Sequence, residues 1–276
     1  MDNKHFIPLN VSKNGLSAVP VDVLLAQVRI VAHRLDKQMQ LSASRKLSFN
    51  IRLLEPLSVR LREYESRDEG RHCQPEYSWA LNIERLYLSA IHDGDRFRYP
   101  WKEVPGMGFA GREFERLVLT RRSIRSFIDA PIDDAIVRKI VEYGSWAPST
   151  CNVQAVRFIV AKSTGVRAEI VHGGLSGTAG GCVIATVVDL RFYDDYNVDG
   201  PIHDSAAAIE NMLLGAHCHG LGGCYISDRG VDADKYRALL GVGDYEKITA
   251  FTWIGYYDRS PIVPARRSVD DLLKVV

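Results

Sequence analysis

A nearly unbroken run of apolar and β-branched residues, Cys182–Leu190, constrains the fold of this chain more than any other feature. Strands that are buried on both faces read as continuous hydrophobic runs, whereas half-exposed strands alternate polar and apolar residues. The run is also far too short for a helix that crosses a bilayer, which needs about 20 apolar residues. We therefore expect a sheet whose central strand is Cys182–Leu190 and whose two faces are both covered.

The rest of the second half of the chain supplies elements that can surround such a strand. Strand patterns occur at 158–161, 223–227 and 249–257, and helix patterns at 113–118, 134–147, 205–219 and 232–240. Asp133 or Asp134 is expected to cap the helix that ends at Pro148, and Asp204 or Ser205 the helix that ends at Gly220. These patterns predict an α+β domain of ordinary size.

The N-terminal part of the chain is patterned as helices. Apolar residues recur at helical spacing over 21–39 and 77–91. A third helical pattern covers 51–61, where Pro56 predicts a kink or a break. Residues 92–112 are rich in glycine and proline and are expected to form a linker or a wrapping segment. The predicted organisation is therefore a helical extension and linker at 1–112, followed by a domain at 113–276.

The charge balance argues against a polyanionic partner. The formal net charge is only +1, whereas proteins dedicated to nucleic acids usually carry a basic excess. The longest basic runs are two pairs, Arg121-Arg122 and Arg266-Arg267. A pair of arginines suits one phosphate group better than a polymer, so we expect a small-molecule substrate and no nucleic acid.

The cysteines and the N-terminus bear on the compartment. The five cysteines are irregularly spaced, and no Cys-x-x-Cys occurs, which argues against a secreted disulfide framework. The first residues, Met-Asp-Asn-Lys-His, open no signal peptide. We expect a cytoplasmic protein with no membrane partner.

Three separated clusters hold the residue types that a phosphorylated cofactor with a polar ring requires. Arginine offers the fork geometry that suits a phosphate dianion, and side-chain amides can pair with a ring edge. Each cluster alone has an ordinary alternative, because an arginine-rich helix end is usually a solvated face and Pro-Ser-Thr is usually a helix stop. The clusters are Arg121-Arg122-Ser123-Ile124-Arg125, Ala147-Pro148-Ser149-Thr150-Cys151-Asn152-Val153-Gln154 and Arg266-Arg267.

Taken together and in this order, the clusters resemble the nitroreductase family of FMN enzymes. The family's Arg-Arg-Ser-x-Arg-x-Phe segment stands here at 121–127, and its Ala-Pro-Ser-x-x-Asn-x-Gln segment at 147–154. Further matching segments are Phe158-Ile159-Val160, Gly220-Leu221-Gly222, Gly230-Val231-Asp232, Gly255-Tyr256 and Arg266-Arg267. The resemblance covers about residues 113–276. It implies an α+β nitroreductase-like fold, with a central, mostly antiparallel sheet flanked by helices, that works as a homodimer.

The resemblance also implies roles for individual residues in holding FMN. Arg125 would lie near the pyrimidine edge and favour the anionic reduced flavin. The flavin carries the chemistry, so no side chain is expected to be catalytic, and no metal site is expected. The phosphate and the ribityl chain would be held by Arg121, Arg122 and Ser123, with Arg266 and Arg267 completing the phosphate site. The ring would meet Pro148, Ser149, Asn152 and Gln154, the first three from the partner subunit, and also Arg229 and Gly230, with a backbone N–H aimed at N5.

The implied activity is a ping-pong flavin cycle with a small acceptor. Hydride would come from NAD(P)H or from an organic substrate, and the acceptor would be a nitro compound, a quinone, an enone or a biosynthetic intermediate. Two alternatives stay open: a flavin-dependent dehydrogenase or oxidase of a biosynthetic pathway that does not use NAD(P)H, and a catalytically inactive binding protein on the same fold.

The chain departs from the family pattern in places. Ala155 and Val156 stand where the family usually has proline and an aromatic residue, so the wall beside the substrate differs. Cys151 is interpreted as a packing residue, because no histidine or aspartate partner is apparent. The segment 33–37, His-Arg-Leu-Asp-Lys, is similar to a segment of a subgroup with a helical extension, with Gln38 in place of its glycine. An amphipathic helix with a charged face explains it equally well.

Two weaker signals have structural explanations. His217 and His219 are two residues apart and would point to different sides of a helix, which does not suit a zinc site with Cys224. The segment 220–223, Gly-Leu-Gly-Gly, follows a helix and leads into a strand. That is the reverse of a dinucleotide-binding loop, so we expect a helix cap and a tight turn there.

Overall fold

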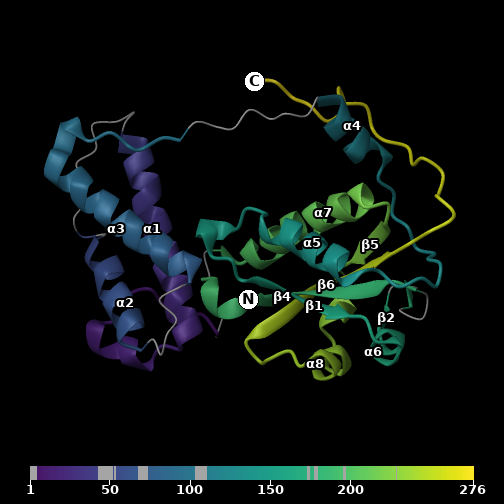
Figure 1. Ribbon diagram of the computed structural model, residues 1–276, viewed down its shortest axis with the longest axis horizontal. Helices are drawn as coiled ribbons and strands as arrows, with labels where there is room; N and C mark the ends of the chain where they lie inside the picture. Colours follow the sequence, from purple (N-terminus) through teal and green to yellow (C-terminus); the bar gives the residue numbers. More distant parts are fainter. Residues whose placement is uncertain are drawn as a thin grey trace.

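The computed structural model describes residues 5–42, 52, 54–67, 74–102, 111–172, 175–176, 180–194, 197–227 and 229–276. Two parts are visible in Figure 1, a group of N-terminal helices and a larger sheet-containing part. The first holds α1 (Val21–Ser42), α2 (Leu54–Ser66) and α3 (Pro75–Asp93). A 3₁₀ turn (Lys13–Ala18) precedes α1. No described helix is long and apolar enough to cross a membrane.

The N-terminal helices form a hydrophobic core of their own. Leu24 and Leu35 of α1 are fully buried against Leu57 of α2 and Tyr87 of α3. The helical patterns at 21–39 and 77–91 are thereby confirmed, and that at 51–61 is confirmed from Leu54 onward, since residues 51 and 53 lie outside the described residues. The kink expected at Pro56 was wrong, because Pro56 is the third residue of α2. In the first turn of a helix the N–H groups have no helical acceptor, so proline is accommodated without a break.

The larger part is built on a four-stranded antiparallel sheet of order β1-β4-β6-β5. The strands are β1 (Val156–Ala161), β4 (Cys182–Asp189), β6 (Glu246–Gly255) and β5 (Gly222–Ile226). Every residue of β4 from Cys182 to Val188 is buried. The expected central strand and the α+β class with an antiparallel sheet are confirmed.

Both faces of the sheet are covered, as Figure 1 shows. On one face α5 (Asp134–Ser145) and α7 (Gly200–Cys218) pack against the sheet, with Ile140 and Met212 against Ile184. On the other face lie α6 (Thr164–Glu169), α8 (Asp234–Leu240) and a small hairpin, β2 (Val171–His172) with β3 (Leu175–Ser176). Tyr236 and Phe251 are buried in that second layer. Because both faces of β4 are covered, the strand needs no polar face, which explains its continuous apolar sequence.

The helix ends test two predicted caps. The Asp133 carboxylate accepts a hydrogen bond from the N–H of Ala135 at 2.7 Å, so the cap of α5 is confirmed. The cap predicted at Asp204 or Ser205 was wrong, because α7 begins earlier, with Asp199 as its N-cap residue and Pro201 in its first turn. Asp204 therefore lies inside the helix, where its carboxylate is free to serve another segment.

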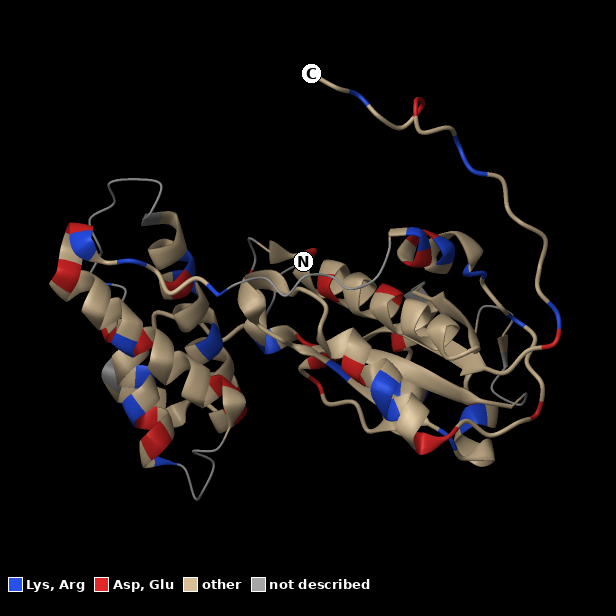
Figure 2. Ribbon diagram, turned by 45° about the horizontal axis from the view of Figure 1, so that its top comes forward, with Lys and Arg blue, Asp and Glu red and all other residues tan. Residues whose placement is uncertain are grey.

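Two segments of the larger part have little cover. Helix α4 (Gly111–Thr120) exposes Phe114, Val118 and Leu119, and none of its residues is buried. Residues 258–276 form no helix or strand and are exposed throughout, Leu272 and Leu273 included. Figure 2 shows positive and negative residues interspersed along the helices of both parts.

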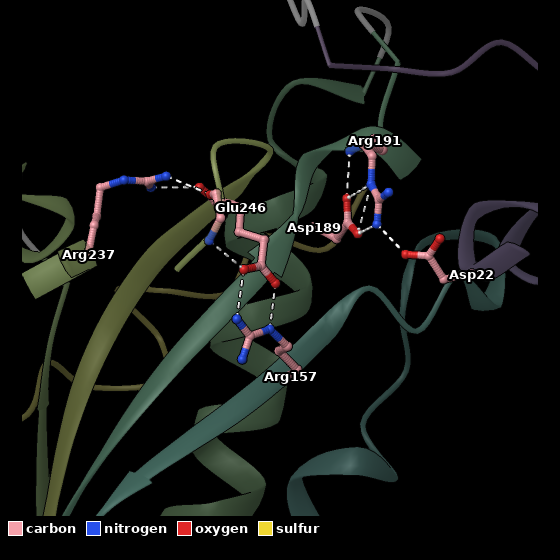
Figure 3. A network of polar contacts seen from close by, with 7 residues as sticks. Asp22, Arg157, Asp189, Arg191, Arg237 and Glu246 are labelled. Carbon is pink, nitrogen blue, oxygen red and sulfur yellow. Dashed lines mark hydrogen bonds and ion pairs between the residues drawn. The ribbon is translucent and has the colours of Figure 1, made fainter. Parts of the chain in front are cut away.

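A polar network joins the strand ends to α1 (Figure 3). Arg157 Nη2 of β1 donates to Glu246 Oε2 at 2.7 Å, and the Gly243 N–H donates to the same oxygen at 2.9 Å. Nearby, Arg191 Nε donates to Asp189 Oδ1 at 2.9 Å and Arg191 also pairs with Asp22 of α1. The network fixes the ends of β4 and β6 and connects them to the N-terminal helices.

We predict that Glu246 makes stability pH-dependent. Burial alone raises the pKa of Glu246, but its hydrogen bonds with Arg157 and the Gly243 N–H, with the charges of Arg157 and Arg191, lower the pKa below its ordinary value of 4.5. A depressed pKa gives stability that is present above the unfolded-state value and lost as pH falls through the folded-state value. Glu246→Gln should cost about 1–2 kcal/mol near pH 7 and weaken this acid-side loss.

Urea unfolding between about pH 7 and pH 3 measures this difference between wild type and variant. Glu142→Gln is the matched control, because the Lys139–Glu142 pair is half exposed and should contribute little. Parallel stability curves for Glu246→Gln and wild type over the acid range would contradict the prediction.

Candidate functional site

The first predicted cluster lies along an edge of the sheet. Ser123 forms a parallel bridge with Gly223 of β5, and the N–H of Ile124 donates to the Gly223 carbonyl at 3.1 Å. The Ile124 side chain is only 3% exposed. Since successive side chains of an extended segment point to opposite sides, the burial of Ile124 turns Ser123 and Arg125 outward. The buried isoleucine thus orients the polar residues beside it.

This edge meets the C-terminal segment at a cleft of about 290 Å³. Four arginines surround a small volume there, and one of them comes from the far end of the chain. The described lining residues are Arg121, Arg122, Ser123, Arg125, Pro261, Ile262, Pro264 and Arg266. We call this the arginine cleft. It brings the first and third predicted clusters together.

The arginine cleft has an excess of positive charge. Arg121 Nε lies 3.7 Å from Glu210 Oε1, a half-exposed partner. Arg122 donates to the carbonyls of Leu119 and Arg121, and Arg125 to that of Ser123. Within the part of the chain that the structure describes, no carboxylate pairs with Arg122, Arg125 or Arg266. Clustered guanidinium groups whose charges are not balanced form a site for a compact dianion such as a phosphate.

The pKa of a histidine near the arginine cleft, His217, is affected by the same arginine charges. The pKa of His217, near the end of α7, is lowered first by burial and then by the positive charges of Arg121 and Arg122. His217 Nε2 lies 2.8 Å from Thr120 Oγ1, and the ring of His219 stacks on Tyr143. Among the described residues no group of histidine, cysteine, aspartate and glutamate is arranged to hold a metal ion. Ordinary contacts account for both histidines.

The second predicted cluster forms a strained loop between α5 and β1. Its backbone has positive φ at Cys151 (49°), Asn152 (54°) and Gln154 (52°). This region costs non-glycine residues about 1–2 kcal/mol each, least for asparagine. The Gln154 N–H donates to Ser149 Oγ at 3.1 Å, and Gln154 Nε2 donates to Asn152 Oδ1 at 3.2 Å. Strain of this kind persists only where surrounding contacts hold it, and it concentrates at functional sites.

Asp204 is one of the groups that hold this loop. Its carboxylate, on a residue only 5% exposed, accepts hydrogen bonds from the N–H and the hydroxyl of Thr150 at 3.0 and 3.1 Å. The Tyr193 hydroxyl donates to the other Asp204 oxygen at 2.7 Å. Burial, and then Asp204, raise the pKa of Tyr193, so the phenol stays protonated. The misassigned cap residue is therefore an anchor for the loop.

The loop borders a second cleft, of about 110 Å³. Its lining includes Pro148, Ser149, Gln154 and Asp204, but none of the described residues of the arginine cleft. Asn152 is close by, through its hydrogen bond with Gln154. The first and second predicted clusters therefore do not share a cleft within one chain.

Two of the remaining predicted residues, Gly230 and Arg267, are not among the described lining of either cleft. Arg229 and Gly230 belong to a 3₁₀ turn (Arg229–Asp232) that follows β5, and the Gly230 carbonyl accepts from the Ala233 N–H. Arg267 donates to the Asp271 carbonyl at 2.9 Å within the C-terminal segment. Cys151 packs against a cluster that includes Val153 and Ile30.

Two residues that hold the loop, Asp204 and Arg29, are not among the site residues predicted from the sequence. The sequence around Asp204 predicts a helix cap, and none of its neighbours indicates an anchor for a distant loop. Arg29 of α1 donates twice to the Val153 carbonyl. A signal for Arg29 was present: residues 23–32 are apolar on all sides except Gln27 and Arg29. A helix that is apolar all round is buried, and its polar residues then need partners.

Comparisons with known proteins agree with one another. The model of the nitroreductase family matches residues 118–172 and 175–256. A protein of Archaeoglobus fulgidus, provisionally named NADH dehydrogenase/NAD(P)H nitroreductase, is 29% identical over 51% of this chain and 83% of its own. The NADPH-flavin oxidoreductase of Vibrio harveyi is 27% identical over 54% and 68%.

A solved structure resembles the same part of the chain. A protein of Desulfovibrio desulfuricans, provisionally named a nitroreductase and solved in complex with FMN, aligns with a TM-score of 0.52 and 26% identity. The alignment covers 62% of this chain and 96% of that one.

Proposed function

The chain belongs to the nitroreductase family, and on that premise we propose that it is an FMN-dependent oxidoreductase whose phosphate site is the arginine cleft. The observation that carries the proposal is the convergence of Arg121, Arg122, Ser123 and Arg125 with Arg266 around one small volume. The donor set fits FMN, because the fork-shaped guanidinium groups suit its phosphate dianion. One homologue is named a flavin oxidoreductase, and one structural neighbour was solved with FMN.

The protein's own groups would position the cofactor and set its electrostatics. When bound, FMN supplies the hydride chemistry. Arg121, Arg122 and Ser123 would hold the phosphate and ribityl chain, with Arg266 and Arg267 at the phosphate. Arg125 would place positive charge near the pyrimidine edge, which favours a reduced anionic ring. Arg229 and Gly230 would lie beside the ring, with a backbone N–H aimed at N5.

The loop of the second cluster would complete the site from a second copy of the chain. The arginine cleft and the loop's cleft have no described lining residue in common within one chain. A two-fold assembly would give each site Pro148, Ser149 and Asn152 from the partner. The exposed apolar residues of α4 and of the C-terminal segment, Phe114, Leu119, Leu272 and Leu273 among them, are surface that such an assembly would cover.

The proposed reaction is a two-step flavin cycle. NAD(P)H or an organic substrate would give up hydride in the first step. A small acceptor (a nitro compound, a quinone, an enone or a biosynthetic intermediate) would take it up in the second. Ala155 and Val156 stand where the family usually has proline and an aromatic residue, so the wall beside the substrate would differ from the usual one.

We predict that the purified protein is yellow and bleaches when NADPH or NADH is added without oxygen. An absorbance spectrum before and after the addition measures both properties. Yellow protein that keeps its colour would contradict the proposed reductase. It would indicate a dehydrogenase or oxidase that takes hydride from an organic substrate. Colourless protein that also takes up no added FMN would contradict the flavin proposal and favour an inactive binding protein.

We predict a homodimer in solution. Light scattering during gel filtration should give about twice the chain mass of 30.9 kDa. A flavin-loaded monomer would show that one chain completes the site alone, and the partner's role in the proposal would be abandoned.

We predict that Arg266→Ala weakens FMN binding by about tenfold to a hundredfold, since a charge-assisted hydrogen bond contributes roughly 1.5–3 kcal/mol. Flavin fluorescence during titration of the apoprotein gives the dissociation constant. Arg259→Ala is the matched control, because Arg259 is an exposed arginine of the same segment that is absent from the described cleft lining. Equal losses in the two variants would contradict a specific phosphate contact.

A further inference from the structure

The N-terminal helices contact the strained loop directly. Arg29 of α1 donates from Nε and Nη2 to the Val153 carbonyl, at 3.2 and 3.0 Å. Its remaining terminal nitrogen, Nη1, lies 3.6 Å from Glu76 Oε1 of α3. The Arg29 side chain is 9% exposed and Val153 is 1% exposed. The helical extension thus binds one carbonyl of the sheet-containing part through a buried guanidinium.

That carbonyl belongs to the peptide group that decides the conformation of Gln154. The oxygen of Val153 and the N–H of Gln154 lie in one plane, because the peptide bond is rigid. Arg29 binds the oxygen edge of this plane, and Ser149 Oγ accepts from the N–H edge at 3.1 Å. Rotation of the plane would change φ of Gln154, which is held at 52°. The two contacts together fix the strained residue.

The surrounding contacts keep Arg29 in register with the loop. Ile30, the next residue of α1, packs with Val153, Ala155, Val188 and Tyr193 in one buried cluster. Near the start of α1, Asp22 pairs with Arg191, beyond the end of β4. Helix α1 is therefore docked on both sides of the point at which Arg29 reaches the loop.

We propose that Arg29 is a positioning residue, through which the helical extension holds the Val153–Gln154 peptide and so presents Asn152 and Gln154 in the geometry that the bound flavin requires. The inference rests on the proposed function for its effect on the flavin. Its structural part, the restraint on the peptide, can be measured in the protein without cofactor. On this view the extension is part of the scaffold of the site and more than a cover over it.

The test compares Arg29→Ala and Arg29→Lys with Arg60→Ala in the full chain. Arg60 is a matched control, because it is another buried arginine of the extension. It donates to Gln27 and to the carbonyls of Pro56 and Leu9, all within the extension, and forms no hydrogen bond with the loop. Hydrogen exchange of the backbone amides of 149–155, in apoprotein well below the melting temperature, reports on the restraint. FMN affinity, the visible spectrum of the bound flavin, and kcat and KM report on the consequence.

Arg29→Ala should speed exchange of the Gln154 amide and weaken FMN binding, each about tenfold, as expected for loss of a hydrogen bond to a charged group. Arg29→Lys should recover part of both, because an ammonium offers one point donor in place of the fork. Arg60→Ala should lower the melting temperature and leave the loop amides and the flavin spectrum as in wild type.

An unchanged exchange rate of the Gln154 amide in Arg29→Ala would overturn the proposal. An equal rise of that exchange rate in Arg60→Ala would also overturn it, because it would indicate general loosening of the extension. A wild-type protein that binds no FMN would instead refute the proposed function. The exchange comparison would still decide whether Arg29 restrains the loop.

Discussion

The burial of β4 on both faces is the constraint on which the rest of the structure depends. A strand with no polar face must be paired on both edges and covered by two layers, because buried N–H and C=O groups need partners and apolar surface must leave water. β1 and β6 supply the pairing, and α5 and α7 cover one face. The α6, α8 and hairpin layer covers the other. The polar residues of the two predicted clusters consequently lie at the edges and ends of the sheet.

Two such places illustrate how a rigid centre positions polar residues. Beside β5, the buried Ile124 fixes the direction of its neighbours, so the arginines around it face a common cleft with Arg266. Ahead of β1, Asp204 and Arg29 hold a loop whose backbone is strained at Cys151, Asn152 and Gln154. In both places buried groups determine the geometry of polar residues that a cofactor could use.

The helical extension also contacts the sheet-containing part. Its core is separate, yet α1 contributes Asp22, Arg29 and Ile30 to contacts with the sheet-containing part. Each contact involves a segment next to an end of β1 or β4. The extension therefore reaches the places where the chain leaves the central strands, which are the places from which a sheet can position side chains.

Local pattern determined a large share of this protein in advance. The apolar run of β4, the helix periods of α1 and α3, the Asp133 cap and the ordered motifs around Arg121 and Pro148 are properties of neighbouring residues, so the sequence alone predicted the fold class and the candidate residues. The family resemblance also implies that Arg266 joins Arg121 and that Pro148 belongs to the partner's side of the site, and the tertiary structure brings Arg266 to the cleft of Arg121 and leaves Pro148 at another cleft. Only the tertiary structure decided that Asp204 and Arg29 serve a distant loop. The reason is physical: long-range hydrogen bonds depend on how elements pack, and a single side chain carries no periodic signal of its partner.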